Sequence, residues 1–145
     1  FVNVQNDYSL LNRAVEQDVL PVCERLGISL MPYFPLASGM LTGKYRRGEE
    51  HPEGSRLAAW GARAGMFASD EKFDVVERLT GYAEAHGHTI TELALSWLAG
   101  TPAIGSVIAG ATSPEQVRAN AAATTAWQLT DAERAEVDAL ARVDA

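Results

Sequence analysis

Residues 110–112 (GAT) have the residue types that bind a phosphate group. Gly110 lets a ligand approach the backbone closely, and the hydroxyl of Thr112 can donate a hydrogen bond. Residues 113–116 (SPEQ) then carry the signals of a helix start, where free backbone amides attract anions. An ordinary tight connection between a strand and a helix would use the same residues, and this motif alone favours that interpretation over a phosphate site.

A second candidate site is the segment 32–39 (PYFPLASG), which follows an expected strand. Ligand sites of α/β proteins lie at the carboxyl ends of parallel strands. The ring of Tyr33 could therefore stack on a flat cofactor ring. A buried aromatic residue beside prolines that end the strand is the alternative, and the segment by itself favours neither.

Other candidate sites lack necessary residues. Residues 39–44 (GMLTGK) are one residue short of a Walker loop, and Tyr45 stands where Ser or Thr would bind magnesium. His86 and His88 have no third or fourth ligand nearby, so we expect a solvated turn and no metal. The basic residues 44–47 are followed at once by glutamates, which indicates a solvated face. No Ser/His/Asp or Cys/His arrangement can be assembled, so we predict no catalytic residue in the chain.

The composition indicates one compact domain. The chain has 145 residues, of which 47% are hydrophobic and 21% charged, and this excludes a disordered or collagen-like chain. The net charge of −7 argues against nucleic acid and anionic membranes as partners. Cys23 is the single cysteine, so no internal disulfide can form, which fits the cytoplasm. The sequence has no apolar run long enough for a membrane span. The start at Phe1, inside an apolar stretch, suggests a fragment.

Three strands and five helices are expected to position the candidate groups. Alternating residues predict a strand over 1–5 that ends in a polar turn at 6–7, and apolar runs predict strands over 28–31 and 104–108. A helix between the first two strands, ended by Gly27, makes a βαβ unit and hence a parallel sheet. Residues 32–68 show no clean period and are expected to form a long loop. The expected helix N-caps are Asp18, Ser69, Thr89, Ser113 and Thr130.

Taken together, these segments resemble the aldo-keto reductase superfamily. The resemblance rests on the words VQNDYSLLNR (4–13), PYFPLASG (32–39), LTGKY (41–45), ELALSWL (92–98) and VIAGATSPEQV (107–117), with Asn120 after them. It implies an α/β fold of the (β/α)8 TIM-barrel type and the reduction of a small aldehyde or ketone with NADP(H). The three strands resemble strands six to eight of such a barrel. Residues 1–145 would then be a single partial domain, the C-terminal cofactor-binding half.

The resemblance also assigns roles to particular positions. Gln5 matches the residue that holds the nicotinamide carboxamide, and Tyr33 matches the aromatic that stacks on the nicotinamide ring. The loop over the pyrophosphate matches Phe34, Leu36, Ser38, Gly39 and Lys44. The adenosine end matches Gly110, Ala111, Thr112, Gln116 and Asn120.

Three departures from the family pattern bear on function. Ala109 stands where a proline is common, and Ala119 stands where an acidic residue is usual. No basic side chain occupies position 110 or 111 to hold the 2′-phosphate. The family's catalytic Asp, Tyr, Lys and His come from earlier strands and match no position in this chain. Two other functions therefore stay open: a non-catalytic half-barrel that binds the nucleotide, and a structural half-barrel that self-associates through open sheet edges.

Overall fold

The computed structural model describes residues 1–142. Strands β1 (Asn3–Asp7) and β2 (Ser29–Tyr33) are connected by the 3-10 helix η1 (Ala14–Glu16) and by α1 (Val19–Leu26). The segment after β2 contains η2 (Ala37–Thr42), α2 (Arg56–Trp60) and η3 (Gly61–Met66). Four longer helices follow: α3 (Asp70–Ala85), α4 (Ile90–Ala99), α5 (Pro114–Ala123) and α6 (Asp131–Leu140). The expected long loop at 32–68 is thus interrupted by three short helices, a correction that reflects local turns too short to produce a readable period.

The predicted βαβ unit is confirmed. β1 and β2 are parallel neighbours, with Asn3 opposite Ser29 and Asp7 opposite Tyr33. Both strands begin and end later than the sequence pattern suggested. The expected polar turn at residues 6–7 is wrong, because both residues still pair with β2 and the ladder outweighs their turn preference.

The expected third strand, 104–108, is not a regular strand. Two isolated parallel bridges join it to β2, Leu30 with Ile104 and Tyr33 with Ile108. Between these bridges β2 advances three residues while the segment advances four. The extra residue breaks the ladder in the way a bulge does. The segment therefore lies where a third parallel strand was expected, without continuous pairing.

The helix ends follow the predicted capping chemistry. Gly27 ends α1 with a φ of 65°, a left-handed conformation that glycine adopts without steric cost. Thr89 and Thr130 each form a complete capping box, with Glu92 and Glu133 as the partners. The hydrogen bond from the Thr89 backbone amide holds the pKa of Glu92 below its ordinary value. Both boxes were predicted from spacing alone.

The other three caps are correct in position, but only one of them makes a side-chain capping hydrogen bond. Asp18 and Ser69 precede α1 and α3, but neither side chain accepts a capping hydrogen bond. Ser113 accepts one from the amide of Gln116, at 3.3 Å. The side chain of Gln116 does not complete that box, because its Oε1 accepts from the amide of Thr112, at 2.7 Å.

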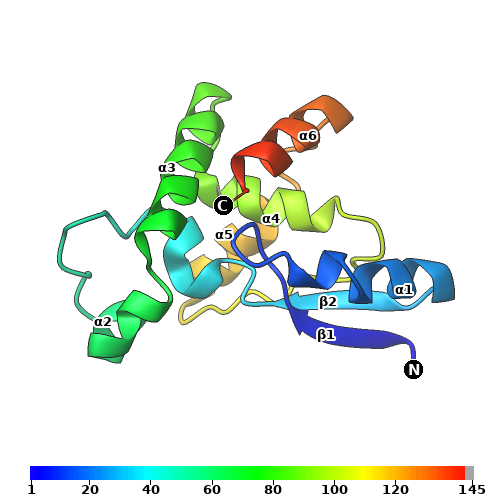
Figure 1. Ribbon diagram of the computed structural model, residues 1–145, viewed down its shortest axis with the longest axis horizontal. Coiled ribbons are helices and arrows are strands. Elements are labelled where there is room, and N and C mark those ends of the chain that lie inside the picture. Colours follow the sequence, from blue (N-terminus) through cyan, green and yellow to red (C-terminus); the bar gives the residue numbers. More distant parts are fainter. Residues whose placement is uncertain (143–145) are drawn as a thin grey trace.

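The core lies between the strands and the longer helices. Figure 1 shows α3, α4 and α6 on one side of β1 and β2, with α1 beside β2. α4 contributes more buried residues than any other described helix: Ile90 and the six consecutive residues 93–98 are buried, and Ser96 is the one polar residue among them. The largest fully buried side chains are Trp97, Tyr8, Leu10, Leu30, Met40, Leu41, Leu57, Leu79, Leu93, Leu95, Leu98 and Val75.

Candidate functional site

The parallel arrangement brings the carboxyl ends of β1, β2 and the segment 104–108 together at one end of the sheet. Tyr33 is the last residue of β2, and its bridge partner Ile108 lies two residues before Gly110. Gln5, in β1, pairs with Met31 of β2. The segments that carry the predicted nicotinamide contacts and the predicted phosphate contacts are therefore neighbours, as α/β architecture requires of a shared ligand site.

Two aromatic rings lie partly exposed at this end of the sheet. Tyr33 is 39% exposed and Phe34 is 44% exposed, and their rings meet edge to face with centroids 5.3 Å apart. The ring of Tyr33 is thus accessible for stacking, and the alternative of a buried aromatic residue is wrong. The guanidinium of Arg56, at the start of α2, lies 5.5 Å from the centroid of the Phe34 ring. Sequence reasoning missed Arg56, because α2 itself was not expected.

The backbone turns sharply after Phe34. Phe34, Ala37 and Ser38 have positive φ values of 53°, 46° and 58°, and Gly39 follows with 97°. The amides of Ala37 and Gly39 donate within the turn, to the carbonyls of Phe34 and Leu36, each at 2.8 Å. Non-glycine residues with positive φ are strained, and such strain gathers at ligand sites.

Lys44 lies directly across this turn. A Cβ added to Gly39 would be 2.9 Å from Lys44 Cε and 3.1 Å from Nζ, so a side chain at position 39 would push the end of the lysine aside. The predicted loop residues Leu36 and Ser38 are less available, since Leu36 is half-buried and Ser38 is buried. The exposed side chains at this turn are those of Lys44 and Phe34.

The segment 110–112 is fastened to the first turns of α5. Gln116 Oε1 accepts hydrogen bonds from the amide and the hydroxyl of Thr112, at 2.7 and 3.1 Å. Asn120 Nδ2 donates to the Gly110 carbonyl, at 3.3 Å. These two side chains hold the segment in place in this structure, and their role at the adenosine end stays a prediction.

A shallow open depression of about 520 Å³ lies beside this segment. Its lining residues are Ala111, Thr112, Ser113, Pro114, Val117 and Arg118. A Cβ at Gly110 would meet no atom within 4 Å, so the space in front of it is open to a ligand. A nicotinamide dinucleotide carries a flat ring and phosphates, and an exposed aromatic face, two basic side chains and a helix start suit these groups. The residues present fit that cofactor.

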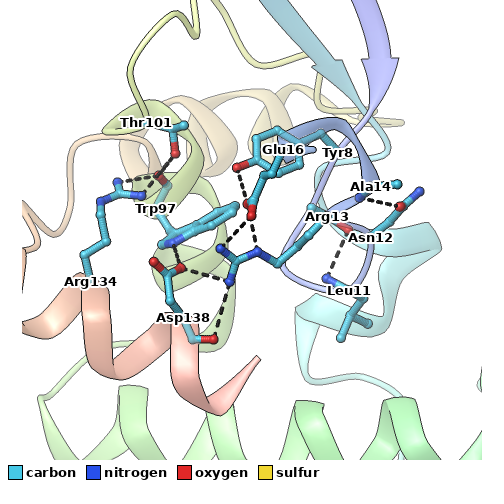
Figure 2. Close-up of polar contacts among 11 residues, drawn as sticks. Tyr8, Leu11, Asn12, Arg13, Ala14, Glu16, Trp97, Thr101, Arg134 and Asp138 are labelled. Atoms are coloured by element: carbon cyan, nitrogen blue, oxygen red, sulfur yellow. Dashed lines mark hydrogen bonds and ion pairs between the residues drawn. The ribbon is translucent and has the colours of Figure 1, made fainter. Parts of the chain in front are cut away.

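A half-buried polar network anchors the chain immediately after β1 (Figure 2). Tyr8 donates to Glu16 Oε1 at 2.8 Å, and burial together with this hydrogen bond raises the pKa of the Tyr8 hydroxyl. Arg13 pairs with Glu16 at 2.8 Å and with Asp138 of α6 at 3.0 Å. Trp97 Nε1 donates to the same carboxylate, at 3.0 Å. The network joins the end of β1 to α4 and α6, and so fixes the strand that carries Gln5.

The histidines hold aromatic contacts that the sequence did not reveal. His88 stacks on Trp127 with ring centroids 4.5 Å apart, and His86 lies 5.3 Å from the same ring. The expected solvated turn is therefore only partly correct. His51 Nδ1 is buried without a hydrogen-bond partner, next to the ring of Tyr45.

Among residues 1–142 no three acidic, histidine or cysteine side chains form a group that could hold a metal. No helix in the same residues is long and apolar enough to cross a membrane.

Comparison with known proteins defines the class. The model of the aldo/keto reductase family matches residues 1–142. A similar solved structure, the aldo-keto reductase AKR11C1 from Bacillus halodurans in its holo form, has a TM-score of 0.75 at 28% identity. The match covers 99% of this chain and 44% of that one. The chain belongs to the aldo/keto reductase family and is an α/β segment with TIM-barrel structural neighbours.

Curated relatives agree on the family and differ in their named activities. The NADH-specific methylglyoxal reductase of Escherichia coli (strain K12) is 38% identical over 121 residues, which cover 83% of this chain and 36% of the reductase. A probable voltage-gated potassium channel subunit beta of Arabidopsis thaliana is 38% identical over 119 residues, covering 80% of this chain and 36% of the subunit. The chain spans about a third of the length of these relatives.

Proposed function

We propose that this chain supplies the cofactor-binding part of an NADP(H)-dependent aldo-keto reductase, an oxidoreductase that acts on a small aldehyde or ketone. The observation that supports the proposal is the bridge between Tyr33 and Ile108, which brings the carboxyl end of β2 next to the segment that leads into residues 110–112. The segments would be strands six to eight of the barrel. The proposal includes a cytoplasmic location, which the free thiol of Cys23 supports.

The residues of this chain bind and orient the cofactor. The exposed ring of Tyr33 would cover one face of the nicotinamide, and the side-chain amide of Gln5 would hold its carboxamide. Lys44 and Arg56 would neutralise the phosphates, and the amides at the start of α5 would receive the phosphate of the adenosine end. When bound, the nicotinamide supplies hydride-transfer chemistry. No position here is proposed as a catalytic acid.

Removing the aromatic ring tests the nicotinamide end. In the full chain, Tyr33→Ala is expected to weaken binding of the nicotinamide nucleotide by about 0.5–1.5 kcal/mol, or roughly two- to tenfold in Kd, because the stacking face is lost. Tyr33→Phe keeps the ring and should bind like the parent. Isothermal titration with NADPH and NADH measures both. Equal Kd values for the alanine variant and the parent would remove Tyr33 from the site.

Adding a basic group tests the 2′-phosphate. Ala111 lines the depression beside α5 and carries no charge. Ala111→Arg is expected to improve the Kd for NADPH relative to NADH by about tenfold, because guanidinium binds phosphate through paired hydrogen bonds. Ala111→Gln is the uncharged control. A ratio that stays constant would place the 2′-phosphate elsewhere, and preference of the parent for NADH would agree with the name of the Escherichia coli relative.

The open edge of β1 supports a second proposal, association between copies of the chain. Within residues 1–142, β1 pairs with β2 alone, and Phe1 and Val2 beside it are highly exposed. An unpaired edge next to apolar side chains favours strand pairing with another segment. Light scattering over a wide concentration range tests this, and a constant monomer mass would exclude it.

A further inference from the structure

Residues 43–55 connect two parts of the candidate site without forming a helix or a strand, and we call them the strap. At one end, Lys44 lies across Gly39. Directly after the other end, Arg56 lies over the ring of Phe34. Three glycines, at positions 43, 48 and 54, have φ values of 73°, 74° and 73° and give the strap its turns. The strap therefore joins the two basic groups of the candidate site.

Only part of the strap is packed into the core. Tyr45 is buried, and its hydroxyl accepts a hydrogen bond from the Leu57 amide at 3.3 Å. Residues 46–50 and 52–54 are exposed. In the described chain, every hydrogen bond or ion pair that joins residues 46–54 to a helix comes from Arg47. The polar attachment of residues 46–54 to a helix thus depends on one side chain, while the His51 ring packs on Tyr45.

Arg47 is held by three carboxylates of α3. Its guanidinium pairs with Asp74, with Asp70 at 3.5 Å and with Glu77 at 3.2 Å. These carboxylates are four and three residues apart, which places them on one helix face, where they would repel each other without a cation. The guanidinium carbon also lies 5.8 Å from the ring centroid of Phe73. Arg47, which the sequence assigned to a solvated basic run, is therefore paired with one face of α3.

We propose that Arg47 is a positioning residue, the latch that holds the strap on α3 and thereby sets how fast the nicotinamide nucleotide leaves the site. This inference rests on the proposed function, since it assumes that Lys44 and Arg56 contact the nucleotide. Exposed ion pairs are individually weak and are screened by salt. A latch built from three of them should hold the strap at low salt and release it at high salt.

The test compares Arg47→Ala with Arg46→Ala in the full chain. Arg46 is an exposed neighbour that forms no ion pair with any residue the structure describes, so its variant removes the same charge without the latch. At a low salt concentration of about 50 mM NaCl, we expect Arg47→Ala to raise the dissociation rate of NADPH or NADH about three- to tenfold. Stopped-flow nicotinamide fluorescence measures this rate. At about 1 M NaCl the rates of Arg47→Ala and the parent should converge, and Arg46→Ala should follow the parent throughout.

Hydrogen exchange supplies a readout that needs no cofactor. Amides of the strap should exchange faster in Arg47→Ala than in Arg46→Ala, while those of α4 stay unchanged. Nucleotide binding with equal dissociation rates in the two variants would overturn the latch and leave the proposed function standing. Failure of the parent to bind either nucleotide would overturn both.

Discussion

Replacing Trp97 with alanine is expected to lower the free energy of unfolding by about 3–5 kcal/mol, because a large, fully enclosed side chain is lost. Trp97 is 1% exposed and lies on α4 between two guanidinium groups. Arg13 lies 5.1 Å and Arg134 lies 5.5 Å from the ring centroid. The Tyr8 ring meets it edge to face at 5.3 Å. The substitution would leave a cavity and remove the ring against which Tyr8 and Arg13, in the segment after β1, pack.

A milder variant separates packing from hydrogen bonding. Trp97→Phe keeps much of the ring but removes the Nε1 donor to Asp138. It should cost about 1–3 kcal/mol, since a part-buried carboxylate loses a partner. Urea denaturation followed by circular dichroism measures both variants. A loss below about 1 kcal/mol for Trp97→Ala would contradict the role assigned to the network.

Local features of the fold could be predicted because they depend on neighbours in sequence. The capping boxes at Thr89 and Thr130 need only one residue and another three positions later. Gly27 ends α1 because its own backbone tolerates positive φ. Strand ends were less predictable: Asn6 and Asp7 prefer turns, and only the presence of β2 beside them keeps them extended.

Long-range polar contacts could not be predicted. Arg47 and the carboxylates of α3 are separated by more than twenty residues, and nothing in either segment indicates that they meet. The same holds for Arg13 and Asp138. His88 was assigned to a solvated turn because its partner Trp127 is distant in sequence. Charge and aromatic pairing are set by how helices pack, which residue spacing within one segment does not encode.

The candidate site was predicted from two different sources. Residue chemistry made the segment 110–112 and Tyr33 candidates without deciding for either, and the bridge from Tyr33 to Ile108 brings their segments side by side. Resemblance to the family added Gln5 and the residues from Phe34 to Lys44. Neither source indicated Arg56, whose place over Phe34 depends on the unexpected helix α2. The side chains of Gln116 and Asn120 hydrogen-bond to the protein backbone, and their role at the adenosine end stays a prediction.

Gly105→Ala is expected to destabilise the chain by about 1–3 kcal/mol, because the added methyl group has no room. Its Cβ would lie 2.7 Å from the Cβ of Ser29, at the start of β2. The contact would push residues 104–108 away from β2 and weaken the hydrogen bonds on either side of it. One of these, from the Gly105 amide to the Leu30 carbonyl, is 3.1 Å long. Urea denaturation provides the free energies.

Two further variants make this result specific to the strand contact. Gly81→Ala, on an exposed position of α3 with no atom within 4 Å of the new Cβ, should be neutral or stabilising by about 0.4–1 kcal/mol. Ser29→Gly should remove the clash, so the double variant should be less destabilised than the sum of its single variants. Additive losses would mean that Ser29 does not limit position 105. Since residues 104–108 lead directly to Gly110, a confirmed clash should also weaken nucleotide binding, which Ser29→Gly should restore.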